Sequence, residues 1–190
     1  MSTSEARERL LDAAVDQAMN GGIGDLSLRE LAAAIGTSHR MLLYHFGSRE
    51  GLLAAVARRV EEAQRAMVAE WDLTVDAQRS WQHFSDPKLW PQERLFFELY
   101  AHALLGRPGT EGFVEAVVQP WIALLAGHLT NAGLDQDRAR AQARLALAVT
   151  RGLLLDLLGT GDHAGVTEAF ALFQALAEHY FADHPSDQGG

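Results

Sequence analysis

The sequence contains no cysteine and only five prolines among its 190 residues. Without cysteine the chain can form neither disulfide bonds nor thiolate metal sites, which is typical of a protein from a reducing cytoplasm. HExxH, GxSxG, P-loop and GxGxxG patterns are also missing, and the histidines show no metal-ligand spacing. We therefore expect no enzymatic activity, no metal site and no cofactor.

Long hydrophobic runs are equally scarce. The most apolar run, residues 145–158, is interrupted by Arg151 and Asp156 and is too short to span a membrane. The first residues, MSTSEARERL, are polar and charged, unlike a signal peptide. Hydrophobic residues nevertheless make up 48% of the chain, enough to build a sizeable core. The sequence therefore predicts a soluble, cytoplasmic protein without a membrane segment.

The most informative stretch is residues 26–53, LSLRELAAAIGTSHRMLLYHFGSREGLL. Ser27 and Glu30 fit a capping box at the start of one helix. Gly36 can take positive φ at a tight turn, after which Ser38 can cap a second short helix. Two helices joined by such a turn predict a helix-turn-helix, whose second helix enters the major groove of DNA.

The second of these helices has an outward face suited to contacts. With 100° per residue and Leu42 facing inward, Arg40 and Tyr44 project from the opposite ridge. An arginine there can reach base edges, and a phenol can reach phosphate. The alternative is a short helical hairpin inside an all-α core. Because the outward face also carries His39 and Leu43, it favours a contact surface.

The distribution of charge is compatible with a nucleic-acid partner, although the chain has a formal net charge of −9. Duplex binding depends on neutralising phosphates. Four arginines and one glutamate lie between residues 36 and 60, so this segment is positive and the remainder is more acidic. A basic patch on an acidic body predicts a DNA-binding face that docks in one orientation.

Helical periodicity extends over the rest of the chain, and no segment favours a β-strand. A first helix is predicted over 2–20 and a long fourth helix over 49–71. Further helices are predicted over 75–84, 91–105, 110–131, 136–158 and 166–182, with a kink at Pro120. The predicted fold is all-α with about nine helices. We expect a helix-turn-helix DNA-binding domain over 1–50 and a helical ligand-binding and dimerisation domain over 51–190.

The last two long helices suggest how copies of the chain associate. Residues 145–158 are apolar on nearly all sides and require cover on two faces. The final helix carries an apolar stripe at Val166, Phe170, Phe173, Leu176 and Tyr180. Two such helices can pair with their symmetry copies in a four-helix bundle, which predicts a homodimer. The alternative is that both helices are interior to a monomer.

These residues resemble those of the TetR family of bacterial transcriptional regulators. The motifs LRELA, GTS, YHF and SREGLL stand in the family's order and spacing. The resemblance implies an N-terminal three-helix DNA-binding domain and a C-terminal domain that dimerises and holds a small-molecule pocket. It implies DNA contacts at Ser27, Arg29, Thr37, Ser38, His39, Arg40, Tyr44, His45 and Arg49. Where the family commonly has an aromatic residue this chain has Leu43, which can contact a thymine methyl group.

Aromatic and polar residues of the second half suggest a ligand pocket. One hypothesis places Tyr100, Trp121, His128 and Arg151 around a largely apolar cavity with a few polar contacts. The alternative assigns the aromatic side chains to the core, together with satisfied histidines and an internal ion pair between Arg151 and Asp156. Both interpretations stand at this point.

The sequence therefore predicts a ligand-responsive transcriptional regulator. In this reading a homodimeric repressor binds a palindromic operator in double-stranded DNA and is released by a small-molecule effector. A second hypothesis is an all-α binding or enzymatic module without sequence-specific DNA binding. A third keeps DNA binding but replaces the small molecule with a protein partner.

Overall fold

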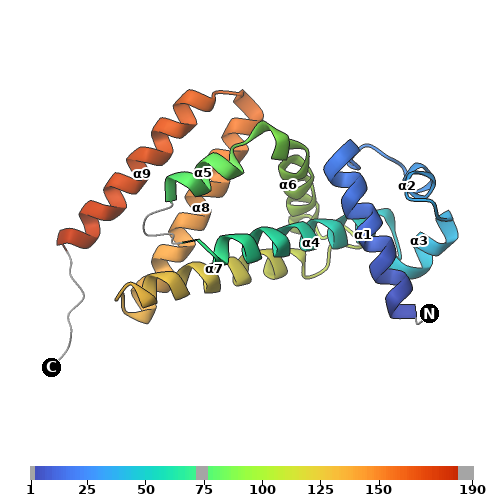
Figure 1. The fold of residues 1–190 in the computed structure, drawn as a ribbon, viewed down its shortest axis with the longest axis horizontal. Coiled ribbons are helices and arrows are strands. Elements are labelled where there is room, and N and C mark those ends of the chain that lie inside the picture. The colour runs from blue at the N-terminus through green and yellow to red at the C-terminus, as the bar shows by residue number, and fades with distance from the viewer. Residues whose placement is uncertain (1–2, 72–76, 184–190) are drawn as a thin grey trace. The chain divides into compact units, whose positions relative to one another are not determined.

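The structure is a computed structural model that describes residues 3–71 and 77–183. In these ranges the chain forms nine α-helices and one short 3-10 helix, and no strand (Figure 1). The elements are α1 (Thr3–Gly21), α2 (Leu28–Ala34), α3 (His39–Phe46), α4 (Arg49–Ala69), α5 (Ala77–Phe84), η1 (Pro87–Leu89), α6 (Trp90–Leu104), α7 (Phe113–Asn131), α8 (Gln136–Thr160) and α9 (His163–Asp183). The predicted all-α fold is confirmed. Residues 75 and 76, where the fifth helix is predicted to begin, lie outside the described residues.

Two helices, α7 and α9, begin three residues away from the predicted position. Helix α7 begins at Phe113 and not at residue 110, because Gly112 takes a φ of 65° that does not continue a helix. Helix α9 begins at His163 and not at residue 166, because the Asp162 carboxylate accepts the Gly165 N–H at 2.9 Å and caps the helix early. Pro120 lies inside α7, and the kink expected there stays a prediction.

The chain forms two compact units. Residues Met1–Gln64 and Trp90–Val117 make the first unit, and Arg65–Leu89 and Val118–Gly190 make the second. Helix α6 therefore belongs with the N-terminal helices and contacts α1, which the sequence did not predict. The predicted division at residue 50 does not coincide with these units; as a division of function it stays a prediction.

The core of the first unit surrounds the start of α4. All residues from 52 to 57 are buried, among them Leu52, Leu53 and Val56, each at most 1% exposed. An amphipathic surface helix buries one stripe, so a run of consecutive buried residues requires cover on every side. Ala54 and Ala57 lie in this run, and their small side chains allow neighbouring helices to approach closely. Helical periodicity alone does not indicate burial on every side of this segment.

Contacts of charged side chains hold α1 against α3 and α4. The Arg59 guanidinium donates to the Glu8 carboxylate and, at 2.6 Å, to the Asp12 carboxylate, so α4 is tied to α1. The hydrogen bond to Glu8 raises the pKa of Arg59. On the same helix, the Arg7 guanidinium lies 5.1 Å from the centre of the Phe46 ring at the end of α3.

The loop between α6 and α7 rests on the start of α4. Gly109 has a φ of 89°, and a Cβ atom there would lie 2.7 Å from the Ser48 hydroxyl oxygen and 2.9 Å from the Gly51 nitrogen. Hydrogen bonds from its own backbone N–H and from the Gly109 N–H, the latter at 2.9 Å, lower the pKa of the Glu111 carboxylate. The loop therefore needs glycine at 109 both for its backbone angle and for its close approach to α4.

In the second unit α8 and α9 form a helical hairpin, and α5 packs against α9 (Figure 1). The Trp81 ring stacks on Phe170 with centroids 4.8 Å apart, and its indole N–H donates to the Thr167 hydroxyl at 3.0 Å. Val166 and Phe170 are buried, whereas Leu176 and Tyr180 are 61% and 52% exposed. The predicted stripe of α9 therefore has a covered first half and an uncovered second half.

Among the described helices, α7 alone is long and apolar enough to cross a membrane by length and composition. It carries Pro120, and its Phe113, Val117 and Ile122 side chains are fully buried in the structure. A single helix of this kind is weak evidence for a membrane segment.

We expect Gly109→Ala to destabilise the protein more than Gly106→Ala. Both glycines have positive φ, but a Cβ at Gly106 would meet nothing within 4 Å. Each substitution should therefore lose about 1 kcal/mol from left-handed backbone strain, and Gly109→Ala should lose roughly 1 to 3 kcal/mol more from overpacking. Urea unfolding measures the difference, and equal losses for the two variants would show that the contact with α4 is unimportant.

Candidate nucleic-acid interface

Helix α2 begins with the predicted capping box. The Ser27 N–H donates to the Glu30 carboxylate at 2.8 Å, and the Glu30 N–H donates to the Ser27 hydroxyl oxygen at 3.3 Å. Hydrogen bonds to the Glu30 carboxylate from the Ser27 side chain and from the Ser27 N–H hold the pKa of Glu30 below its ordinary value. Their stabilisation is therefore present above the ordinary glutamate pKa and is lost as the pH falls through the lowered value.

The turn between α2 and α3 follows from Gly36 and Ser38. Gly36 takes a φ of 69°, and the chain then turns so that the Thr37 N–H donates to the Ala32 carbonyl at 2.8 Å. The Ser38 hydroxyl oxygen accepts the Met41 N–H at 3.2 Å and caps α3. Leu42 is fully buried, as predicted, so α3 has a fixed inward face.

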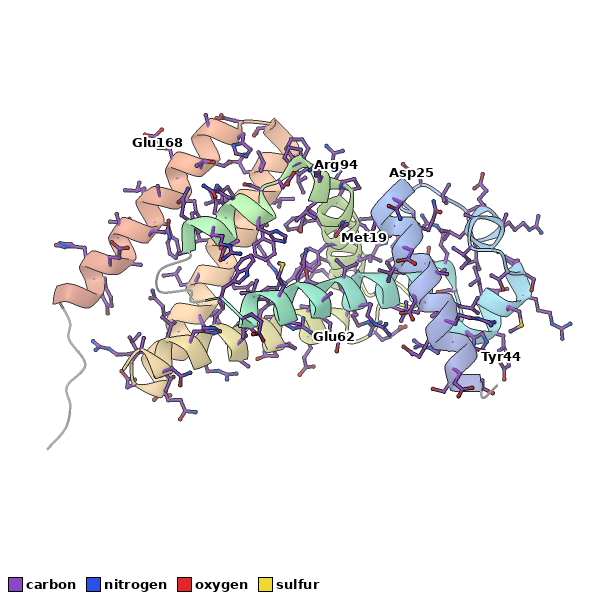
Figure 2. All side chains as sticks on the ribbon, in the orientation of Figure 1. Met19, Asp25, Tyr44, Glu62, Arg94 and Glu168 are labelled. Carbon is purple, nitrogen blue, oxygen red and sulfur yellow. The ribbon has the colours of Figure 1, made fainter. Side chains whose placement is uncertain are left out.

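The opposite face of α3 points to solvent. Arg40 and Tyr44 are exposed, Tyr44 to 68%, and Figure 2 shows the Tyr44 side chain projecting away from the helix. Leu43 and Met41 are each 39% exposed. Met41 is not among the predicted contacts, although the same 100° steps that identify Arg40 and Tyr44 place it beside them.

Other predicted contact residues are less exposed. Thr37 and His39 are half-buried, whereas Ser27, Arg29 and Ser38 are exposed. The His45 ring lies between its neighbours, with ring centroids 4.9 Å from Tyr44 and 6.4 Å from Phe46. Its Nε2 atom is buried and has no hydrogen-bond partner in the described part of the chain. A DNA contact by His45 stays a prediction.

Arg49 has an internal role that the sequence did not indicate. Its Nε–H donates to the Leu26 carbonyl at 2.8 Å, and a terminal N–H donates to the Gly24 carbonyl. The side chain therefore ties the start of α4 to the loop that precedes α2. The predicted phosphate contact of Arg49 stays a prediction.

The exposed positive charge is smaller than the count of arginines suggested. Of the four arginines between residues 36 and 60, Arg40 alone is exposed. Arg59 pairs with α1, and the Arg58 guanidinium lies 6.0 Å from the Phe113 ring, where burial lowers the pKa of Arg58. Arg29 adds a second exposed guanidinium on α2. The basic patch is therefore centred on the helix-turn-helix itself.

Residues 10–56, which include this helix-turn-helix, match the model of a family described as bacterial regulatory proteins, tetR family. This segment is therefore a DNA-binding domain of the TetR family. The chain is a DNA-binding transcriptional regulator. No curated protein matches the sequence.

Three solved structures show the same fold. A TetR-family transcriptional regulator from Streptomyces coelicolor is 19% identical, with a TM-score of 0.68, over 95% of this chain and 85% of that one. The multidrug binding protein EbrR, complexed with proflavin, is 25% identical, with a TM-score of 0.63, over 87% and 98%. The TetR-family repressor FadR of Thermus thermophilus, in complex with lauroyl-CoA, is 17% identical, with a TM-score of 0.65, over 90% and 92%.

The four residues predicted to line a ligand pocket do not belong to one compact unit of the chain. Tyr100 is half-buried in the first unit, with its ring 5.7 Å from Phe96. The other three are in the second unit. Trp121 is buried, the His128 Nδ1 atom lies 2.9 Å from the Leu124 carbonyl oxygen, and Arg151 is half-buried. Their role in a pocket stays a prediction.

A small cavity lies in the first unit between α1, α4 and α6, lined by none of these four residues. Its volume is about 10 Å³, close to what one water molecule needs. The buried polar side chains Glu61, Gln92 and Glu93 line it among apolar ones. The cavity is therefore sized for water and not for a drug-sized ligand. Among the described residues no group of three or more histidine, aspartate or glutamate side chains could hold a metal ion.

Proposed function

We propose that this regulator is a homodimeric repressor that binds a palindromic operator and is released by a small-molecule effector in the cytoplasm. The observation that carries the proposal is the outward ridge of α3, where Arg40 and Tyr44 are exposed on a helix that is capped by Ser38 and anchored by Leu42. A helix held in this way can enter the major groove without rearrangement.

The proposed contacts divide into base readout and backbone positioning. Arg40, at the leading turn of α3, is placed to donate two hydrogen bonds to a guanine edge. Tyr44 and the exposed hydroxyls can contact phosphates, and Arg29 adds charge from α2. The full proposed set is Ser27, Arg29, Thr37, Ser38, His39, Arg40, Leu43, Tyr44, His45 and Arg49.

The uncovered apolar side chains of α8 and α9 support the homodimer. Leu145 and Leu155 on α8 are 53% and 54% exposed, and Leu172 and Leu176 on α9 are each 61% exposed. Such leucines on one helical hairpin form an apolar surface of the kind that marks an interface. Pairing with the same hairpin of a second copy would bury them. A dimer would present two recognition helices about 34 to 36 Å apart.

Two similar proteins support a small-molecule effector, since EbrR was solved with proflavin and FadR with lauroyl-CoA. We place the effector in the second unit, near Trp121, His128 and Arg151. It would act by favouring a conformation in which the two recognition helices no longer fit the operator, and only its differential affinity for the two states can drive release. Helix α4 is proposed to transmit this change to the recognition helix. It starts directly after α3, and the loop at Gly109 contacts this start of α4.

Selection of bound duplexes from a random pool tests the DNA-binding proposal, and a palindromic site is expected. On that site Arg40→Ala should reduce discrimination at one base position per half-site by about 1 to 3 kcal/mol. Arg144→Ala, which removes an exposed charge from α8, is the matched control. Unchanged discrimination by Arg40→Ala would exclude Arg40 as the base-reading residue. A pool without any enriched sequence would reject the operator model.

The double substitution Leu172→Glu and Leu176→Glu should convert the dimer to a monomer, because it buries two charges in the proposed interface. Analytical ultracentrifugation measures the mass of the particle in solution. The affinity for the operator should also fall when the dimer dissociates. Leu104→Glu, at a leucine of α6 that is 70% exposed, is the control and should remain dimeric. A double variant that stays dimeric would place the interface elsewhere.

With the operator as probe, effectors can be screened by release of the protein from DNA. His128→Ala and Arg151→Ala should each raise the effector concentration needed for release by roughly tenfold, the effect of losing one hydrogen bond to a charged or buried group. Arg144→Ala again serves as control. If neither variant changed the response to any effector found, the pocket assignment would be wrong.

A further inference from the structure

Two aliphatic side chains flank the polar ridge of α3. Measured around the helix from the buried Leu42, Leu43 lies about 100° to one side and Met41 about 100° to the other. Arg40 and Tyr44 occupy the arc between them. Met41 and Leu43 have the same exposed fraction, 39%, so each lies at one edge of the outward face.

The Met41 and Leu43 side chains cannot turn into the core. Leu42 is fully buried and the Ser38 cap defines where α3 begins, so the rotation of the helix about its axis is set from the inside. Met41 and Leu43 therefore leave apolar surface next to the exposed Tyr44 phenol. On a helix that enters the major groove, exposed apolar side chains on both flanks are available for contact with the bases.

The major groove offers one apolar group to such side chains, the C5 methyl of thymine. The C5 position lies at the side of the pyrimidine that is nearer the backbone of its own strand. A helix in the groove presents its centre to the base-pair floor and its two flanks to the two strands. Residues 41 and 43 are also about 3 Å apart along the helix axis, close to one base-pair step.

We propose that Met41 and Leu43 read the methyl groups of two thymines, one on each strand, beside the base pair that Arg40 contacts. The inference rests on the proposed operator binding and adds to it the chemical group that sets sequence preference. Leu43 supplies one of these contacts, and Met41 supplies the second. The recognition helix thus combines one charged contact with two apolar ones.

The test replaces single thymines of the selected operator by deoxyuridine, which removes only the methyl group. For the wild-type protein we expect two sensitive thymines per half-site, on opposite strands, each raising the dissociation constant about fourfold, which is the value of one buried methyl-sized group. Met41→Ala should abolish the penalty at one of them and Leu43→Ala at the other. Met19→Ala, at an exposed methionine of α1, is the control and should keep both penalties. Thermal melting confirms that the variants are folded.

The outcomes separate this inference from the function on which it rests. A specific site at which deoxyuridine is tolerated at every position would overturn the methyl readout and leave the regulator intact. Penalties that persist unchanged in Met41→Ala and Leu43→Ala would assign the methyl groups to other side chains and equally overturn it. Failure to select any site would overturn operator binding and this inference together.

Discussion

The structure of the first unit depends on one constraint, that the start of α4 is buried on every side. Residues 52–57 have no exposed face, so the other elements of this unit must close around them. Three arginines near this segment secure that arrangement. Arg49 holds the loop before α2, Arg58 covers Phe113, and Arg59 pairs with Glu8 and Asp12. The position of the helix-turn-helix is thus determined by contacts made behind it.

These contacts also explain the distribution of charge on an acidic protein. Arginines that tie helices together are half-buried and contribute little to the field outside the molecule. Within residues 26–60 the exposed guanidinium groups are those of Arg29 and Arg40, on the two helices of the motif itself. Long-range attraction to DNA is therefore limited, and recognition relies more on the close fit of α3 in the groove than on general basicity.

The junction between α3 and α4 connects recognition with the rest of the chain. The Ser48 hydroxyl oxygen accepts the Gly51 N–H at 2.9 Å, and Gly109 of the α6–α7 loop packs against the same two residues. Any displacement of that loop reaches the end of the recognition helix through a few van der Waals contacts. Packed elements of this kind shift between discrete arrangements instead of deforming continuously, which suits an on–off response.

The sequence by itself determined the local features of this protein. The capping box at Ser27 and Glu30, the positive φ of Gly36, the inward Leu42 and the outward Arg40 all follow from interactions within four residues or from the period of a helix. The helix count and the DNA-binding motif followed from the same short-range signals. Met41 was also within reach of this reasoning, because its angle on α3 is given by position alone.

Only the tertiary structure decided which side chains serve the interior and which serve a surface. The partners of Arg49, Arg58 and Arg59, the place of α6 in the first unit and the contact of Gly109 with α4 join residues more than twenty positions apart. The same holds for the division of the α9 stripe, where Trp81 covers Phe170 but the residues that the structure describes leave Leu176 61% exposed. Periodicity shows that a face is apolar, whereas what covers that face depends on where distant segments of the chain pack.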